Sequence, residues 1–196
     1  MFQRFVTATF GLGLALVSAP AFASNWVIDA AHSEVGFSVR HLMVSNVKGK
    51  FTKFEGTINL DDKDITKSVV EVSIDPNSID TGLKDRDDHL KSPDFFDTAK
   101  NPKLTFKSTK VEKAGKGLKV TGDLNLHGVT KSVVLNVEEV TGEVKDPWGN
   151  VKRGATASTV INRKDFGLNW NKALETGGVV VGEEVKISLE LELLKK

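Results

Sequence analysis

The stretch Glu184–Leu193, EVKISLELEL, alternates between polar and apolar side chains over its whole length. Successive side chains of a β-strand point to opposite faces, so this pattern predicts a strand with one apolar and one polar face. The apolar face consists of Val185, Ile187, Leu189, Leu191 and Leu193. A strand of this kind fits an antiparallel sheet that covers an apolar interior on one side.

Similar patterns occur through most of the chain. Between Val47 and Leu60 the phase of the alternation changes after Phe51, which predicts a β-bulge near Thr52 and Lys53, because one extra residue reverses the facing of all that follow. About eight short antiparallel strands with turn signals between them indicate a barrel or a sandwich. Besides the final strand, we expect strands at Trp26–Ile28, Glu34–His41, Val47–Leu60, Val69–Asp75, Lys103–Glu112, Lys119–Leu126, Ser132–Val140 and Ala155–Arg163.

An internal repeat favours the barrel. Gly56–Leu60 recurs as Gly122–Leu126, and Thr66–Val70 recurs as Thr130–Val134, with a loop two residues longer in the first copy. Two related hairpins in one sheet are typical of an up-and-down barrel, although chance convergence of strand and turn sequences is an alternative. We therefore expect an all-β fold, an eight-stranded antiparallel up-and-down barrel.

One segment, Leu83–Asp97 (LKDRDDHLKSPDFFD), does not alternate. Its apolar and charged residues are spaced as in a short helix. Asp80 and Thr81 are the expected N-terminal caps, and Ser92-Pro93 ends the helix because proline disfavours helical geometry in the residue before it. Phe95-Phe96 follows on a loop. We expect this helix to pack at one mouth of the barrel.

The N-terminus has the pattern of a secretory signal peptide. Arg4 precedes the apolar run Phe5–Val17, and Ala21-Phe22-Ala23 is a typical cleavage site. The run is short for a membrane span, which needs about 20 apolar residues, although an uncleaved anchor is the alternative. We predict cleavage after Ala23, which leaves one exported domain from Ser24 to Lys196.

Composition excludes several classes of function. Of 27 Lys and Arg residues, only Arg4 lies in the predicted leader, which holds none of the 26 Asp and Glu residues, so the mature chain is balanced at 26 of each sign. No basic face favours nucleic acid, and no polybasic run favours stable association with anionic lipid. The absence of cysteine excludes cysteine nucleophiles and thiolate metal sites. An outer-membrane barrel is disfavoured, because the chain has no tyrosine and three tryptophans for aromatic girdles.

The sequence allows two interpretations of the barrel interior, a hollow one and a packed one. Gly56, Gly122, Ala155 and Ala157 share the parity of inward-facing neighbours, so small side chains on the inner wall leave room for a cavity. The alternative is that the glycines mark bends where strands turn corners. The sequence leaves both interpretations open.

The polar residues give weak signals for chemistry. His89 lies four residues after Asp85, so the two side chains can meet on a helix. Such a pair can bind a metal or act as a base, but it is more often a surface ion pair, and we expect no metal site. Arg163 lies in the polar-aromatic turn Asn162–Gly167, where it either braces the turn or holds a ligand headgroup.

Six segments in order resemble the YceI-like family: Trp26–His32, Glu34–His41, Arg86–Asp97, Asn101–Phe106, Leu124–Val133 and Ile161–Trp170. The resemblance runs from about Trp26 to the C-terminus. It implies a lipocalin-like antiparallel barrel with an elongated internal cavity, exported to the periplasm. It also implies a binding protein for polyisoprenoids, isoprenoid quinones or other long-chain lipids, with no further cofactor and no enzymatic activity.

These expectations lead to a predicted binding site. The polar end of the lipid is expected near Arg40, Arg86, His89 or Arg163. The helix and the two phenylalanines after it are expected to close one mouth. The predicted apolar lining consists of Phe37, Val39, Phe51, Phe54, Val70, Val72, Phe95, Phe96, Leu104, Phe106, Leu124, Leu126, Leu189 and Leu191.

Three alternatives remain at this stage. A barrel with a solid core would act as a periplasmic stress or interaction protein. An exported hydrolase or isomerase would use His41 or His89 as its base. Exposed strand edges or a swapped terminal strand would allow a homodimer.

Overall fold

The computed structural model describes residues 23–175 and 177–196. The predicted signal peptide lies outside the described residues except for Ala23, so its cleavage stays a prediction. The elements are β1 (Ala23–Ile28), η1 (Ala30–His32), β2 (Glu34–His41), β3 (Ser45–Phe51), β4 (Phe54–Asp61), η2 (Ile65–Lys67), β5 (Val69–Ile74), η3 (Pro76–Ser78), β6 (Ile79–Asp80), α1 (Lys84–Lys91), β7 (Leu104–Ala114), β8 (Gly117–Leu126), β9 (Val129–Val140), β10 (Val144–Lys145), β11 (Val151–Asn162), η4 (Arg163–Phe166) and β12 (Val181–Lys195).

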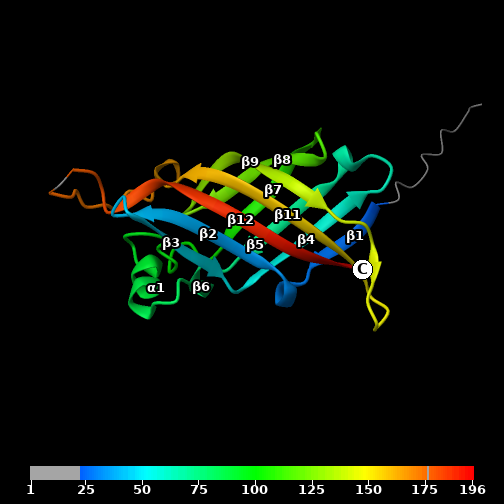
Figure 1. The fold of residues 1–196 in the computed structure, drawn as a ribbon, viewed down its shortest axis with the longest axis horizontal. Coiled ribbons are helices and arrows are strands. Elements are labelled where there is room, and N and C mark those ends of the chain that lie inside the picture. Colours follow the sequence, from blue (N-terminus) through cyan, green and yellow to red (C-terminus); the bar gives the residue numbers. More distant parts are fainter. Residues whose placement is uncertain (1–22, 176) are drawn as a thin grey trace, which may run out of the picture.

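Within the described residues, eight antiparallel strands close into an elongated barrel (Figure 1). The ring runs β1-β4-β5-β7-β8-β9-β11-β12 and returns to β1. Strand β12 makes the closure, because its long run pairs with β11 on one side and with β1 and β2 on the other. The predicted eight-stranded barrel is confirmed.

Three of the ring strands are interrupted, which is why the structure has more strand segments than ring positions. The 3-10 turn η1 separates β1 from β2, and η3 separates β5 from β6. A break at Thr52 and Lys53 separates β3 from β4, at the position where the sequence predicts a bulge. The segments outside the ring, β2, β3 and β6, extend the wall at the end of the barrel that carries α1 (Figure 1).

The predicted helix is present, but its start differs from the prediction. Leu83 is the N-terminal cap residue, and no side-chain hydrogen bond caps the helix. Thr81 instead donates its N–H and its hydroxyl to Asp87 Oδ1, over 2.9 and 2.5 Å, while Asp80 accepts from Gly82 N. The expected caps thus bind the loop and a helical side chain rather than the free N–H groups of the first turn.

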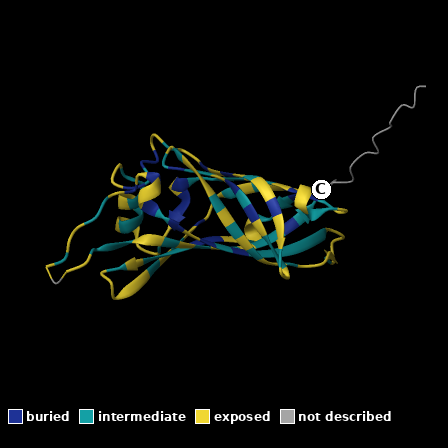
Figure 2. Ribbon diagram, turned by 90° about the horizontal axis from the view of Figure 1, so that it is seen from above, coloured by how far each residue is buried: buried dark blue, intermediate teal, exposed yellow. Residues whose placement is uncertain are grey.

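Exposed and buried residues alternate along the strands (Figure 2). On β12, Glu184, Lys186 and Glu190 point outward, whereas Ile187 and Leu193 face the interior. Apolar side chains therefore line the inside of the barrel and charged ones cover its outside, as hydrophobic burial from water requires.

Two of the small inward residues do not widen the interior. A Cβ atom on Gly122 would lie 2.4 Å from Cζ of Phe106, and one on Gly56 would lie 2.6 Å from Cδ1 of Ile28. The space beside these two glycines is taken by the neighbouring Phe106 and Ile28 side chains, whereas Ala155 and Ala157 line the cavity.

The turn between β2 and β3 has an unusual backbone. Leu42 and Met43 have φ values of 49° and 61°, in the left-handed region. This conformation costs a residue with a side chain roughly 1–2 kcal/mol, and glycine or asparagine usually occupies it. The structure therefore holds two apolar residues in a turn that suits them poorly.

Candidate functional site

An internal cavity of about 270 Å³ runs along the barrel. Apart from Gly36, Ser68, Thr159 and Arg163, every residue that lines it is apolar. The lining comes from Ile28, Val35, Gly36, Phe37, Val39, Phe51, Ile58, Leu60, Ile65, Ser68, Val70, Val72, Ile74, Leu90, Phe95, Phe96, Leu104, Phe106, Val111, Leu118, Val120, Leu124, Leu126, Val133, Leu135, Val137, Val140, Ala155, Ala157, Thr159, Ile161, Arg163, Leu168, Val181, Val185, Ile187, Leu189, Leu191 and Leu193.

The cavity is long and narrow. Val181 and Leu193 both line it and lie twelve residues apart on β12. Strands rise about 3.3 Å per residue and tilt by about 40° in barrels of this size, so the lining extends over roughly 30 Å of the barrel axis. A volume of about 270 Å³ over that length leaves space for one extended chain rather than for a compact ring system.

One end of the cavity is closed by the segment Leu83–Asp97, which we call the lid segment. Leu90 of α1 and the following Phe95 and Phe96 all line the cavity. The ring of Phe96 packs edge-on against Phe51 of β3, with centroids 5.9 Å apart. The helix has eight residues and none of them is buried, so contacts with the barrel rather than its own propensity hold it in place.

A cluster of three rings fastens the lid segment to the loop before β12. His89 and Phe95 lie 5.1 Å apart, and both pack on Trp170 at centroid distances of 5.2 and 5.1 Å. At the start of the segment, Arg86 donates from Nε to Thr81 Oγ1 and from Nη2 to Thr81 O, each over 2.7 Å. The lid segment is thus attached by side chains and not by strand pairing.

The opposite end is filled by Trp26, which is fully buried against Ile58, Leu60 and Leu193. Arg153 lies over the indole with its Cζ 5.2 Å from the ring centroid, and Lys195 Nζ lies 5.4 Å away. Cations over the face of tryptophan are attracted by its π electrons. This end is closed by the strands' own side chains.

The structure places most of the predicted lining residues at the cavity, while their contact with a ligand stays a prediction. All of the predicted residues line the cavity except Phe54, which packs against the neighbouring core instead. The sequence prediction omitted Val111, Val120 and Leu135, although alternation in β7, β8 and β9 marks them. It also omitted Ile65 and Leu168, which lie outside the strands, where no periodic signal exists.

Arg163 is the only charged residue among the described residues that line the cavity. Its side chain is 3% exposed and donates to three backbone carbonyls, those of Leu168, Val181 and Gly182. Burial lowers the pKa of Arg163, but an arginine stays protonated in proteins. The guanidinium therefore braces the loop before β12 and also places a positive charge at the lid end of the cavity.

The other three predicted headgroup residues lie elsewhere. Arg40 is exposed and donates to Met43 O over 2.8 Å, and Arg86 is bound to Thr81. The His89 ring nitrogen pairs with Asp94, 2.9 Å away, rather than with Asp85. None of the three lines the cavity.

The candidate base His41 does not line the cavity either. His41 ends β2, where it pairs with Ser45 and Val181. Neither His41 nor His89 therefore faces a molecule bound inside the barrel.

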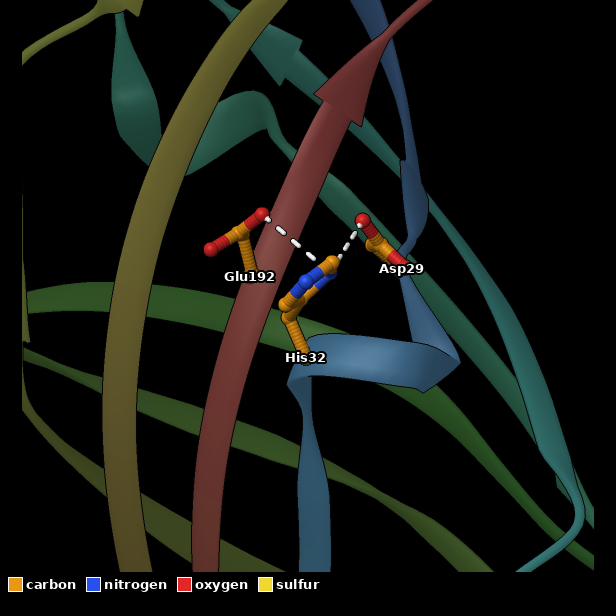
Figure 3. Close-up of side chains that lie close together, drawn as sticks. All are labelled: Asp29, His32 and Glu192. Carbon is orange, nitrogen blue, oxygen red and sulfur yellow. Dashed lines mark hydrogen bonds and ion pairs between the residues drawn. The ribbon is translucent and has the colours of Figure 1, made fainter. Parts of the chain in front are cut away.

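A separate polar cluster joins η1 to β12 (Figure 3). His32 Nδ1 lies 3.0 Å from Asp29 Oδ2 and 3.7 Å from Glu192 Oε1. Their donor atoms are close enough for a metal ion, but Lys152 Nζ contacts both carboxylates, at 3.1 and 2.5 Å. The hydrogen bond from His32, with that from Lys152, lowers the pKa of Asp29. The lysine ammonium thus supplies the positive charge here.

No helix within the described residues is both long and apolar enough to cross a bilayer. The lid helix is short and mostly charged, and its residues lie against the barrel end.

Comparison with known proteins gives relatives and fold neighbours. A UPF0312 protein of Vibrio cholerae is 44% identical over 163 residues, which cover 80% of this chain and 86% of the relative. The crystal structure of BcnA from Burkholderia cenocepacia matches with a TM-score of 0.74 and 25% identity, over 84% of this chain and 98% of that one.

A third match is a polyisoprenoid-binding domain from Saccharophagus degradans, implicated in plant cell wall breakdown. Its TM-score is 0.63 at 20% identity, over 87% of this chain and 98% of the domain, so this match shows the fold alone. The family model of the YceI-like domain matches residues 26–193. The sequence resemblance is thereby confirmed, and the chain belongs to the YceI-like family.

Proposed function

We propose that the protein is a periplasmic carrier that holds one long-chain lipid, of the isoprenoid class, in the barrel cavity. The observation that carries the proposal is the narrow cavity, with an apolar wall along its whole length. A ligand that fills this cavity must be an apolar, extended chain. It can carry only branches that are small enough for the narrow channel.

Burial of an apolar chain supplies enough free energy for binding without any catalytic group. Each methylene moved from water into an apolar site contributes about 0.8 kcal/mol, so about ten carbons give roughly 8 kcal/mol before costs. Immobilising the ligand and ordering the surrounding side chains reduces this gain. Chains longer than that minimum are therefore the expected ligands.

Arg163 supports the placement of the ligand's polar end. Its guanidinium lies at the lid end of the cavity, and no carboxylate among the described residues forms an ion pair with it. Three of its N–H groups go to backbone carbonyls, and a guanidinium has five. We infer that a phosphate or carbonyl oxygen of the lipid lies near Arg163.

Two further observations support the proposal. The sequence pattern of residues 1–23 is that of an export signal. A protein with the same fold, the Saccharophagus degradans domain, is described as polyisoprenoid-binding.

The test is extraction of lipid from protein expressed with its own N-terminal sequence, followed by mass spectrometry. The variant Ala157→Phe places a ring where an 8% exposed methyl group lines the cavity. The matched control is Val160→Phe on the same strand, at a position that is 53% exposed and outside the cavity.

We expect about one long-chain lipid per wild-type and Val160→Phe molecule, and several-fold less in Ala157→Phe because the added ring occupies the channel. Wild-type protein that yields no stoichiometric lipid would contradict the proposal. Equal lipid content in the two variants would place the ligand outside the cavity.

A further inference from the structure

Three consecutive apolar residues project into solvent at the turn between β2 and β3. Leu42, Met43 and Val44 are 39%, 51% and 74% exposed. Single exposed apolar side chains are common on protein surfaces, but contiguous ones mark interaction sites. We call Leu42–Val44 the apolar turn.

The backbone of the apolar turn is held in a fixed shape. Val44 N donates to His41 O over 3.0 Å and closes a β-turn whose two central residues, Leu42 and Met43, both have positive φ. Asparagine followed by glycine is the preferred pair at these two positions. The turn would therefore be more stable with asparagine and glycine in place of Leu42 and Met43. Residues that fit their backbone conformation poorly are typical of functional sites.

Neighbouring groups brace the turn from both sides. Leu42 N donates to Val180 O over 2.8 Å, and the Arg40 guanidinium donates to Met43 O over 2.8 Å. The three apolar side chains are thus displayed by a braced hairpin, with a cationic side chain beside them.

The apolar turn lies at the lid end of the cavity. His41, which precedes the turn, pairs with Val181, and both Val181 and Val39 line the cavity. The β2–β3 turn and the loop before β12 (orange) project from the end of the barrel that carries α1 (Figure 1). An object that contacts the turn therefore lies at the same end of the barrel as the lid segment and Arg163.

Two occupants are chemically possible, and the size of the surface distinguishes between them. A stable protein dimer buries about 800 Å² on each partner, far more than three partly exposed side chains offer. A lipid bilayer needs only shallow insertion of a few apolar side chains below the headgroups. The cation at Arg40 suits the phosphates of those headgroups.

We propose that the apolar turn docks the protein on a lipid bilayer, so that the lid end of the cavity faces the membrane from which its lipid is drawn. This inference rests on the proposed carrier function. It assigns the membrane contact to Leu42, Met43 and Val44 and makes the lid end the entry for the lipid.

The opposite end offers a natural control. Trp148 is 84% exposed in the turn between β10 and β11. That turn is an ordinary one: Asp146 accepts from Trp148 N and Asn150 N, and the positive φ is at Gly149. Trp148 is a single exposed ring beside a carboxylate. The residues of its turn suit their backbone conformations, so the turn shows no backbone strain.

The experiment compares the double variant Leu42→Asn/Met43→Gly with Trp148→Ala and wild type. Sedimentation with vesicles of phosphatidylethanolamine and phosphatidylglycerol measures docking. Uptake of cis-parinaric acid, an unbranched fatty acid labelled by its own fluorescence, is measured both from these vesicles and from solution. The comparison separates entry through a membrane from binding in the cavity. Thermal unfolding of each variant reports whether the turn is strained.

The Asn-Gly variant is expected to bind vesicles roughly tenfold less tightly or weaker still, since two side chains leave the bilayer. Uptake from vesicles should slow by a similar factor, whereas uptake from solution stays unchanged and the melting temperature rises. Trp148→Ala should match wild type in every assay.

Wild-type protein that does not sediment with vesicles overturns the docking proposal, as does an Asn-Gly variant that sediments equally well. Loss of sedimentation in Trp148→Ala alone would place the membrane at the other end and also overturns it. Failure of wild type to take up the labelled acid from solution counts against the carrier function instead, while sedimentation still decides the docking.

Discussion

The two ends of the barrel are closed in different ways. At the far end from α1, Trp26 is part of β1 and is fully buried between strands that pair directly with it. At the other end, the lid segment lies between β6 and β7 and is attached through side chains such as Arg86, His89 and Phe95. The closure at Trp26 is part of the ring of strands, whereas the closure at the lid end is a separate segment packed on the barrel.

The difference indicates which end opens. Displacing Trp26 requires separation of β1 from β4 and β12, which is close to unfolding the barrel. Displacing the lid segment breaks a few side-chain contacts and leaves the strand ladders intact. Segments with few buried contacts open at much lower free energy than core strands.

Each end also carries one inward-facing arginine, in contrasting surroundings. Arg163 at the lid end makes three bonds to carbonyls and borders the cavity. Arg153 stacks on Trp26 and lies 3.6 Å from Glu143, and its buried Nε has no hydrogen-bond partner. The charge at the closed end thus lies beside a carboxylate that it contacts, whereas the charge at the lid end borders the apolar channel and interacts with Glu183 only through space.

The largest effect is expected from Trp26→Ala, which removes the closure that belongs to the barrel. Truncation of a large buried aromatic side chain costs about 3–5 kcal/mol of unfolding free energy. Urea denaturation measures this loss. Trp148→Ala, at an 84% exposed site, should change the unfolding free energy by less than about 0.5 kcal/mol. Similar losses in both variants would contradict the assignment of Trp26 as the structural closure.

A smaller and different effect is expected from Phe95→Ala in the lid segment. Removal of this ring frees His89 and Trp170 and weakens the attachment of the lid without touching a strand. Dissociation of cis-parinaric acid should become about tenfold faster, because weaker contacts act mainly on off-rates. Stopped-flow displacement measures the rate. An unchanged off-rate together with a large loss of stability would make Phe95 a core residue rather than part of a movable lid.

The smallest effect concerns the polar cluster that joins β1, β2 and β12 through η1. The pKa of Asp29 is lowered in the folded protein, so its ionised form stabilises the fold above its ordinary value of 3.8 and this stabilisation is lost as the pH falls through the lowered value. Asp29→Asn should cost about 1 kcal/mol or less near pH 7, since the site is partly solvated.

Melting curves of wild type and Asp29→Asn across the acid range measure this effect. The two melting temperatures should converge as the pH falls through the lowered pKa of Asp29, because both side chains are then uncharged. A difference that persists unchanged in acid would show that the carboxylate charge is not its cause.

Alternation predicts most of the fold and most of the lining, because each strand has one face on the cavity. It locates Phe37, Val72 and Leu191, and it places the interruption of β3–β4 at Thr52. The side chains that close the two ends are less predictable. Trp26 lies within a short strand, and its burial depends on Leu60 and Leu193, which are distant in sequence.

The internal repeat shows where sequence pattern fails. Val69-Val70 and Val133-Val134 occupy equivalent positions in the two copies, and both copies form hairpins, as predicted. In the first copy Val70 faces the cavity and Val69 is exposed, but in the second Val133 faces it and Val134 is exposed. The strand pairing differs by three residues between the copies: Ile58 pairs with Val70, whereas its equivalent Leu124 pairs with Lys131, the equivalent of Lys67. A shift by an odd number of residues exchanges the two faces.

The charged residues were harder to place than the apolar ones. A charge on a strand or helix gives no periodic signal, and its partner is set by distant segments. Asp94 rather than Asp85 meets His89, and Arg163 meets carbonyls of a loop that the sequence does not outline. Their roles depend on tertiary contacts that local pattern does not encode.

The position of β12 has a consequence for the order in which the chain assembles. Strand β12, which follows all the other strands of the barrel, is the neighbour of the first two, β1 and β2, and also of β11. Until the fifteen residues of β12 are in place, three strand edges have backbone N–H and C=O groups without hydrogen-bond partners. The wall is thus completed by pairings between segments far apart in sequence, and contacts of such long sequence separation make folding slow.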